Sequence, residues 1–226
     1  MTPVVKICGI NSFDALDAAL EAGADMIGLV RFPKSPRHLS LEQGRELSSR
    51  AKGRAIRVAL VVDAYDAALA AIVEAFDPDL LQLHGSETPE RVAEIRARFG
   101  RPVMKAMGIA DPADLAQVAP YASVADRLIM DAKPPVTKEA LPGGNGRAFD
   151  WRLLAGLDLE KPFMLSGGLD PDNVARALRL TQAGGVDVSS GVEARPGYKD
   201  PDKIAAFVRA AHAAFEAAPQ NEASPA

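Results

Sequence analysis

The most restrictive feature of this sequence is a unit that recurs eight times, a short apolar segment of strand length followed by a polar turn. In most repeats the turn carries a helix-start signal, such as Thr88 directly before Pro89. The expected strands are 4–9, 26–30, 56–62, 80–84, 102–107, 127–131, 162–165 and 185–189. Helices are expected over 13–21, 41–51, 66–76 and 200–215, with further starts near 88, 111 and 170. Eight such units predict the α/β class and a closed (β/α)8 TIM barrel, with an open doubly wound sheet as the alternative.

A single domain accounts for the chain better than two. The 226 residues could form two small domains or one barrel, but no linker or low-complexity segment divides them. We expect a barrel over 1–216 and a small, polar, disordered tail over 217–226. The segment 132–148 departs from the repeated strand–helix pattern, because it is rich in proline and glycine and has no expected helix. Long loops of this kind are usually functional or mobile.

The composition argues against several classes of function. The formal net charge is -4 and no basic stripe is present, so nucleic acid is not an expected partner. The one cysteine cannot form an internal disulfide, which fits a reducing cytosol. No apolar run approaches the ~20 residues needed to cross a membrane, and the N-terminus lacks an apolar signal core. We expect a cytoplasmic protein, and without a large apolar stripe the sequence favours a monomer over a dimer.

The first expected strand carries unusual chemistry. Alternation places Val5 and Ile7 on one face and Lys6 and Cys8 on the other, which would point into the barrel. A charged side chain is costly to bury unless it is paired or used. Lys6 and Cys8 therefore indicate a functional site rather than ordinary core packing.

Polar residues also end other expected strands. His84, Asp131 and Asp187 fall at or near strand ends on the inward phase, as Cys8 does. Each has an ordinary structural interpretation: a buried thiol, a core histidine, a turn-capping aspartate, and an aspartate paired with Lys6. Because the active sites of (β/α)8 barrels lie at the C-terminal ends of the strands, the four residues together predict one pocket there.

Two loops rich in small residues predict a phosphate site. The segment 165–169 follows the seventh expected strand and 189–193 follows the eighth, and the residues of interest are Gly168, Ser190 and Gly191. Backbone N–H groups in such loops can approach an anion, and this fold often binds phosphate after strands seven and eight.

No cofactor is expected. The three histidines lack metal-ligand spacing, and no Gly-x-Gly-x-x-Gly follows the first strand, so neither a metal nor a dinucleotide is predicted. The chemistry would then be carried by side chains alone. A thiol and a carboxylate facing a phosphosugar suggest proton transfer, as in an isomerase.

With these residues placed, the sequence resembles the phosphoribosylanthranilate isomerase family over nearly its whole length. The resemblance is carried by Lys6-Ile7-Cys8-Gly9, Ser35-Pro36-Arg37, Leu81-Gln82-Leu83-His84-Gly85, Asp131, Gly143-Gly144-Asn145-Gly146, Phe149-Asp150-Trp151, Leu165-Ser166-Gly167-Gly168-Leu169 and Val186-Asp187-Val188-Ser189-Ser190-Gly191-Val192-Glu193. It implies a cofactor-independent Amadori rearrangement of N-(5-phosphoribosyl)anthranilate in tryptophan biosynthesis. Asn145 departs from the threonine common in the family, which concerns the closing of that loop rather than the reaction.

The resemblance also implies roles for individual residues. Asp131 would be the general acid that opens the sugar ring, and Cys8 the general base that removes the proton from carbon 2. A free thiol has a pKa near ~8.5, and we hypothesise that Lys6 lowers the pKa of Cys8. Asp131 must be protonated when it acts, which requires burial or a nearby negative charge.

Further family positions correspond to substrate contacts. Arg37 would hold the anthranilate carboxylate, a task suited to a planar forked donor. His84 and Asp187 would contact the substrate. The backbone of Gly168, Ser190 and Gly191 would hold its phosphate.

Three rival interpretations remain open from the sequence. The Amadori isomerase of histidine biosynthesis would use two carboxylates and two phosphate sites. Indole-glycerol-phosphate synthase would use lysines at strand ends, and Lys105 on the fifth expected strand keeps this possibility open. A catalytically inactive phosphosugar-binding or scaffold protein is the third, and the presence of both Cys8 and Asp131 argues against it.

Overall fold

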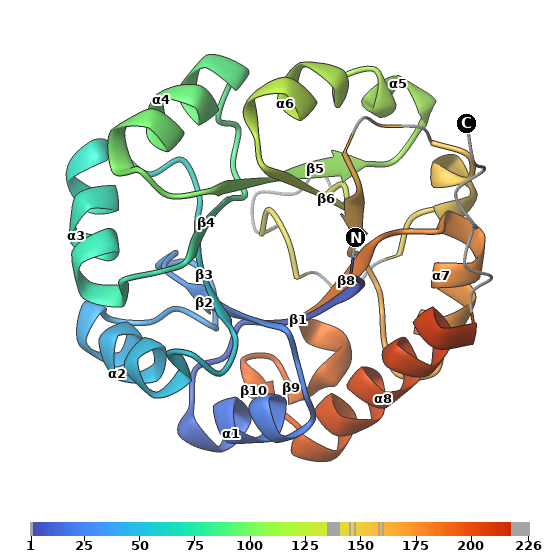
Figure 1. Cartoon of the computed structure of the whole chain (residues 1–226), viewed down its shortest axis with the longest axis horizontal. Coiled ribbons are helices and arrows are strands. Elements are labelled where there is room, and N and C mark those ends of the chain that lie inside the picture. Colours follow the sequence, from blue (N-terminus) through green and yellow to red (C-terminus); the bar gives the residue numbers. More distant parts are fainter. Residues whose placement is uncertain are drawn as a thin grey trace.

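Eight parallel strands close into a barrel in the computed structural model, which describes residues 2–134, 141–144, 146, 148–157, 159 and 161–217 (Figure 1). The strands are β1 (Val4–Cys8), β2 (Met26–Val30), β3 (Ile56–Val61), β4 (Leu80–Leu83), β5 (Val103–Ile109), β6 (Arg127–Ala132), β7 (Phe163–Leu165) and β8 (Gly185–Val188). β1 pairs with β8 in parallel, with Lys6 opposite Asp187. This pairing closes the sheet, so the predicted barrel is confirmed and the open sheet is excluded.

A ring of helices surrounds the barrel (Figure 1). The α-helices are α1 (Phe13–Glu21), α2 (Leu41–Ala51), α3 (Asp66–Phe76), α4 (Pro89–Phe99), α5 (Pro112–Leu115), α6 (Ala119–Val124), α7 (Val174–Thr181) and α8 (Pro201–Ala217). Ser40 and Gln43 form the expected capping box of α2. Thr88 caps α4, with Pro89 in its first turn. Among the described helices, none is both long and apolar enough to cross a membrane.

Two connections differ from the predicted pattern. The helix expected from residue 111 is divided into α5 and α6, and Pro120 lies in the first turn of α6. Proline has no N–H to donate and is tolerated in the first turn of a helix rather than in its interior, which accounts for the restart there. Between β6 and β7 the described chain forms the short 3-10 helix η1 (Trp151–Leu154) in place of an α-helix.

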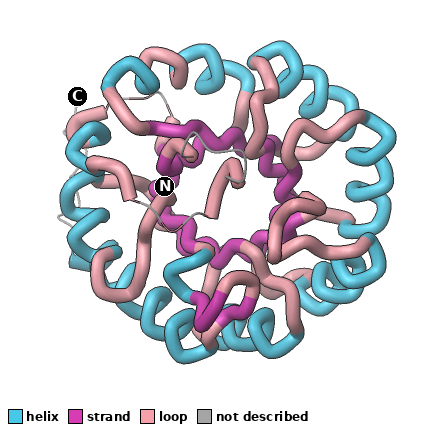
Figure 2. Tube along the Cα trace, turned by 180° about the vertical axis from the view of Figure 1, so that it is seen from behind, coloured by secondary structure: helices cyan, strands magenta, loops and turns pink. Residues whose placement is uncertain are grey.

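A small hairpin after β8 was not predicted. The 3-10 helix η2 (Ser190–Val192) leads into β9 (Glu193–Arg195), which pairs antiparallel with β10 (Tyr198–Lys199). In the tube seen from the other side of the barrel, this hairpin lies beside the barrel opening (Figure 2). It forms a separate two-stranded sheet.

The observed ends of several helices and strands differ from the predicted ends by one or two residues. β4 ends at Leu83, so His84 is the first residue of the following loop. α8 continues through Ala217, which therefore belongs to the helix and not to the expected tail. The remainder of that tail, 218–226, and Asn145 lie outside the described residues.

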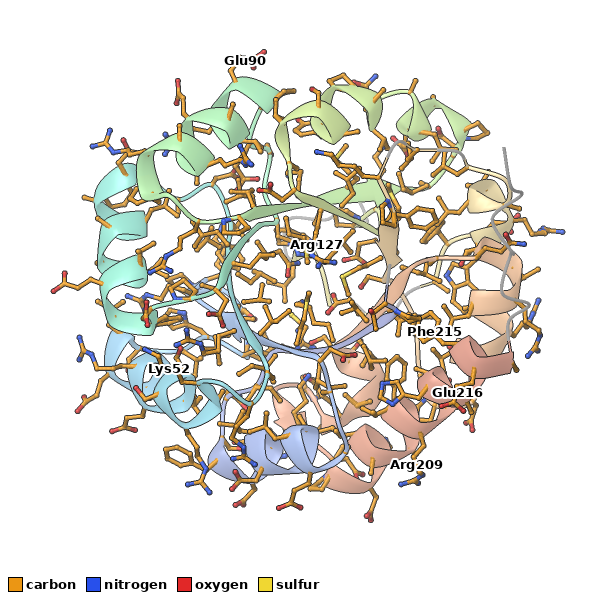
Figure 3. All side chains as sticks on the ribbon, viewed as in Figure 1. Lys52, Glu90, Arg127, Arg209, Phe215 and Glu216 are labelled. Carbon is orange, nitrogen blue, oxygen red and sulfur yellow. The ribbon has the colours of Figure 1, made fainter. Side chains whose placement is uncertain are left out.

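Side chains fill the inside of the barrel, as the stick view shows (Figure 3). The inner apolar cluster consists of Val4, Met26, Val58, Leu80, Met104, Ala106, Ile129 and Met164. Val5 and Ile7 belong instead to the larger core that contains residues of the surrounding helices. The alternation predicted for the first strand is therefore correct, and Lys6 and Cys8 take the inward phase.

Lys6 is fully buried inside the barrel. Its Nζ lies 2.7 Å from Asp187 Oδ1, which is the pairing considered from the sequence. Burial is the largest single effect and disfavours the charged ammonium, but Asp187 and Cys8 together outweigh it and raise the pKa of Lys6. The ion pair spans the seam between the first and last strands of the barrel.

Replacing Lys6 with methionine is expected to lower the free energy of unfolding by about 3 kcal/mol, because it leaves Asp187 charged and unpaired in the interior. Urea unfolding followed by circular dichroism measures the change. The matched control is Asp17→Asn, which breaks the exposed ion pair with Arg50 and should change stability by less than about 1 kcal/mol. Equal effects of the two substitutions would contradict the expectation.

Candidate active site

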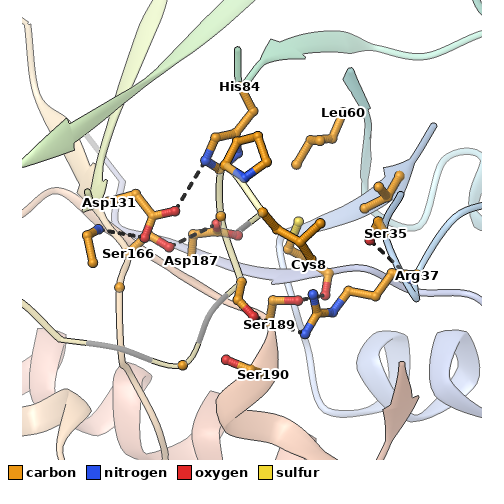
Figure 4. Close-up of a pocket in the computed structure, with 18 of the residues that line it drawn as sticks. Cys8, Ser35, Arg37, Leu60, His84, Asp131, Ser166, Asp187, Ser189 and Ser190 are labelled. Carbon is orange, nitrogen blue, oxygen red and sulfur yellow. Dashed lines mark hydrogen bonds and ion pairs between the residues drawn. The ribbon is translucent and has the colours of Figure 1, made fainter. Parts of the chain in front are cut away.

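A pocket lies at the C-terminal ends of the barrel strands (Figure 4). Seven of the eight predicted site residues line it: Cys8, Arg37, His84, Asp131, Gly168, Asp187 and Ser190. Gly191 does not line it, and a Cβ added there would approach the carbonyl oxygen of Leu169 to 1.8 Å. The inward alternation therefore brings the predicted side chains together, while Gly191 packs against the neighbouring loop.

Cys8 ends β1 with its thiol on the pocket side, and it is 5% exposed. The neighbouring Gly28 on β2 leaves room for the sulfur, since a Cβ there would lie 2.7 Å from Sγ. Burial raises the pKa of the Cys8 thiol, and the opposing effect of Lys6 is smaller. Lys6 does act to lower the pKa of Cys8, as hypothesised from the sequence. The effect of burial is larger, so the pKa of Cys8 is raised overall.

The raised pKa of Cys8 predicts little thiolate at neutral pH in the free protein. Alkylation by iodoacetamide reports the thiolate directly, because Cys8 is the only cysteine in the chain. The alkylation rate should rise steadily through neutral pH and still be increasing at about pH 9, since the pKa lies above the ordinary range. A plateau below pH 8 would contradict the predicted direction, and Cys8→Ala provides the unlabelled control.

Asp131 contacts a histidine across the pocket. One carboxylate oxygen accepts a hydrogen bond from the backbone N–H of Ala132 at 2.8 Å. The other lies 3.2 Å from His84 Nε2, and the two side chains point toward each other in Figure 4. His84 Nδ1 lies 3.1 Å from the amide nitrogen of the fully buried Gln82. The structure thus links Gln82 of β4, His84 directly after β4, and Asp131 of β6 in one chain of contacts. From the sequence, these side chains could be assigned only to the inward face of the barrel.

Arg37 is buried and is not a solvated loop arginine. Its Nε and Nη2 form a bidentate pair with Glu193, at 2.7 and 2.9 Å. Glu193 also accepts from Lys199 Nζ at 2.9 Å. Sequence reasoning gave no role to Glu193 or Lys199, because the contact of Glu193 with Arg37 joins positions 156 residues apart and Lys199 is linked to Arg37 only through Glu193.

The described part of the loop after β6 lies against these same groups. A Cβ added to Gly143 would approach His84 Nε2 to 2.6 Å and Asp131 Oδ2 to 2.8 Å, so a larger residue here would have to displace one of these side chains. Gly144 accepts a hydrogen bond from Arg37 Nη2 through its carbonyl oxygen. Apolar residues line the pocket nearby and can contact an aromatic ring: Val30, Phe32, Leu60, Val62, Leu141 and Pro142.

The opposite part of the lining comes from the loops after β7 and β8. Ser166, Gly167 and Gly168 follow β7, and Ser189 and Ser190 follow β8. Gly168 has φ +68°, a conformation that favours glycine. Small side chains leave the backbone of these loops accessible, which is suited to an anion.

The side chain of Lys105 on β5 points to the outside of the barrel, whereas those of its neighbours Met104 and Ala106 point inward. Its Nζ pairs with Glu87 Oε2 at 3.0 Å and donates to the carbonyl of Gly85 at 2.7 Å. It is not among the described residues that line the pocket. The strand-end lysine required by an indole-glycerol-phosphate synthase is therefore not supplied by Lys105. The fold and the pocket define a (β/α)8 barrel of the enzyme type, with titratable side chains gathered at the C-terminal ends of its strands.

Comparison with known proteins identifies the family. The family model described as N-(5'phosphoribosyl)anthranilate (PRA) isomerase matches residues 5–210, and the chain belongs to this family of tryptophan biosynthesis. The resemblance drawn from the sequence is confirmed.

Relatives and solved structures agree with this assignment. N-(5'-phosphoribosyl)anthranilate isomerase of Azorhizobium caulinodans is 63% identical over 210 residues, covering 93% of this chain and 92% of the relative. The Rhodopseudomonas palustris (strain BisB5) protein of the same name is 59% identical over 217 residues, covering 96% and 99%. The crystal structure of phosphoribosyl anthranilate isomerase from Thermotoga maritima has a TM-score of 0.84 at 34% identity, covering 94% of this chain and 100% of that one. A related structure, with a TM-score of 0.81 at 33% identity and the same coverage, contains reduced 1-(o-carboxyphenylamino)-1-deoxyribulose 5-phosphate.

Proposed function

We propose that the chain converts N-(5-phosphoribosyl)anthranilate into 1-(2-carboxyphenylamino)-1-deoxyribulose 5-phosphate, with Cys8 as general base and Asp131 as general acid. The observation that carries the proposal is that a thiol and a carboxylate line one pocket with the small-residue loops after β7 and β8. That arrangement provides an acid, a base and an anchor for a phosphosugar between them.

The reaction divides into two proton transfers. Asp131 donates a proton to the furanose ring oxygen, the bond from that oxygen to carbon 1 breaks, and a Schiff base forms. Cys8 then removes the proton from carbon 2, and the electron pair of that bond moves into an enolamine. The enolamine tautomerises to the ketone of the product. His84, 3.2 Å from Asp131 Oδ2, is placed to hold the carboxyl group in position during the first transfer.

The other pocket residues are assigned to substrate binding. Arg37 holds the anthranilate carboxylate through the part of its guanidinium that faces the pocket. Asp187, held by Lys6 and 3.3 Å from Ser166 Oγ, contacts the sugar together with His84. Backbone groups of Gly168 and Ser190 bind the phosphate, and Gly191 supports the loop that presents Ser190.

The activity is tested by generating the labile substrate in solution from anthranilate and phosphoribosyl pyrophosphate with a coupling enzyme, and following the loss of anthranilate-type fluorescence. Complementation of a tryptophan auxotroph separates an enzyme from an inactive scaffold protein. Failure of both assays with folded protein would overturn the proposal.

Replacing Arg37 with alanine is expected to raise KM by about 10- to 100-fold with a much smaller change in kcat. A hydrogen-bonded charge pair contributes on this order to binding, and the carboxylate takes no part in the proton transfers. Arg152→Ala, which removes an exposed arginine paired with Asp150, is the matched control. An unchanged KM in the Arg37 variant would contradict the carboxylate assignment.

We further propose that the catalytic unit is the barrel of residues 1–216, working as a monomer in the cytoplasm. The single thiol fits a reducing compartment. Size-exclusion chromatography with light scattering tests the monomer, and a mass of twice 23.8 kDa would contradict it.

A further inference from the structure

The hairpin after β8 contributes two buried charged groups that the proton transfers do not use. Glu193 begins β9 and Lys199 ends β10, and the two residues are register partners. Their charged atoms lie 2.9 Å apart, and the Lys199 side chain is fully buried. Lys199 Nζ also donates to the carbonyl and the hydroxyl oxygen of Ser189, at 2.8 and 3.2 Å. The hairpin is thus fixed to the wall of the pocket.

Glu193 determines which edge of the Arg37 guanidinium is available. The carboxylate accepts from Nε and Nη2 of Arg37, and the carbonyl of Gly144 accepts a second, longer bond from Nη2. Among the hydrogen bonds between described residues, none uses Nη1. Gly144 lies against Nη1, where a Cβ would approach to 2.6 Å, and its lack of a side chain keeps this nitrogen uncovered. Because Arg37 lines the pocket, the N–H groups of Nη1 are left for an anionic group of the ligand.

Lys199 determines the charge of this wall. Arg37 and Glu193 alone would form a neutral pair, whereas the cluster of Arg37, Glu193 and Lys199 carries one net positive charge. An excess charge in a buried cluster is unfavourable until a counter-charge arrives. A ligand carboxylate at Nη1 would supply that counter-charge, and an uncharged ring would not.

We propose that Glu193 and Lys199 are positioning residues that make the pocket selective for an arylamine phosphosugar with a carboxylate on its ring over the same compound without it. Glu193 orients the guanidinium, and Lys199 keeps the cluster cationic. The inference rests on the proposed function, because it requires Arg37 to bind that carboxylate.

The surroundings of Lys199 give the selectivity a pH dependence. The charged and titratable groups near it are Glu193 in the hairpin, Arg37 before α2, Cys8 at the end of β1, and Lys203 of α8, which donates to the Glu193 carbonyl. Burial lowers the pKa of Lys199 to about 8, although Glu193 opposes the shift. The ammonium is charged below this pH and neutral above it, so selectivity should be full at pH 7 and decline above pH 8.

The test measures Kd by calorimetry for two ligands, reduced 1-(o-carboxyphenylamino)-1-deoxyribulose 5-phosphate and its counterpart without the carboxyl group. Both carry the same phosphate, and neither requires Cys8 to ionise. Lys199→Met should weaken the carboxylated ligand by about tenfold, the order expected of one charge acting over several ångströms at a partly buried site. Glu193→Asp keeps the charge but shortens the side chain that holds the guanidinium, and it should weaken the same ligand by a similar factor. Binding of the other ligand should change by less than about twofold. Lys52→Met, which removes an exposed charge paired with Asp77, should change neither Kd.

Two further measurements distinguish a positioning role of Glu193 and Lys199 from a purely structural one. In an Arg37→Ala background, Glu193→Asp should cause no additional loss of preference, because there is no guanidinium left to orient. Raising the pH from 7 to 9 should reduce the preference of the wild-type protein but not that of Lys199→Met. Equal weakening of both ligands in both hairpin variants would overturn the inference while leaving the proposed function intact. A wild-type protein that binds both ligands equally would overturn the inference and the Arg37 assignment together.

Discussion

Replacing Cys8 with alanine is expected to lower kcat by about 10²- to 10⁴-fold, the typical contribution of one general base. The side chain is small, lies at the pocket end of β1 and fills space beside Gly28, so its truncation leaves the barrel intact. What is removed is the only thiol in the chain, and the proton on carbon 2 then has no base positioned to accept it. Single-turnover measurement of the fluorescence loss, at saturating protein, isolates this step from binding.

Cys8→Ser is the matched variant for this prediction. Serine preserves the shape of the side chain, but its hydroxyl does not ionise in the accessible pH range, so kcat should fall by a comparable factor. Both variants should bind the reduced product analogue about as tightly as the wild-type protein. Near-normal turnover by folded Cys8→Ala would remove Cys8 from the mechanism.

Replacing Asp131 with asparagine should also lower kcat by at least about 100-fold. Asparagine has the same shape and can still accept from the Ala132 N–H and contact His84, which preserves the local geometry. It cannot donate a proton to the ring oxygen as a carboxylic acid does, so ring opening becomes the slow step. The readout is steady-state turnover together with trapping of the unopened sugar by rapid quenching.

The control for Asp131→Asn is Asp79→Asn, which alters an aspartate paired with Arg57 and not among the described residues of the pocket. That substitution should leave kcat unchanged within about twofold. Retention of more than a tenth of the wild-type turnover by Asp131→Asn would exclude Asp131 as the general acid.

Much of the barrel and part of the pocket were predictable because they depend on local periodicity. A period of two residues sets which side chains face inward, so Cys8, Asp131 and Asp187 could be assigned to one pocket from the sequence. Pairing between distant segments has no local signature. The contact of Arg37 with Glu193 joins residues 156 positions apart, and the hairpin that carries Glu193 consists of strands of only three and two residues.

The direction of the Cys8 pKa was beyond sequence reasoning for a different reason. It depends on a balance in which burial and the charge of Asp187 raise the pKa, whereas the charges of Lys6 and Lys199 lower it. The sequence places Lys6 near Cys8 and allows a pair with Asp187 as one alternative, but only the structure shows that the charge of Lys6 is paired in this way. Gly191 was predicted to lie in the pocket because of its sequence motif. Its contact with the backbone of Leu169 could not be predicted in this way, because it joins two separate loops.

The seam between β1 and β8 has a consequence for biosynthesis of the protein. The Lys6–Asp187 pair joins residues 181 positions apart, so the first strand emerges from the ribosome long before its last partner exists. Translation at about 5–20 residues per second leaves that strand, with its buried lysine and its thiol, without its final neighbour for roughly ten seconds or more. During this interval Cys8 is open to oxidation or chaperone contact. The pocket cannot be complete until the eighth strand is available to pair with the first.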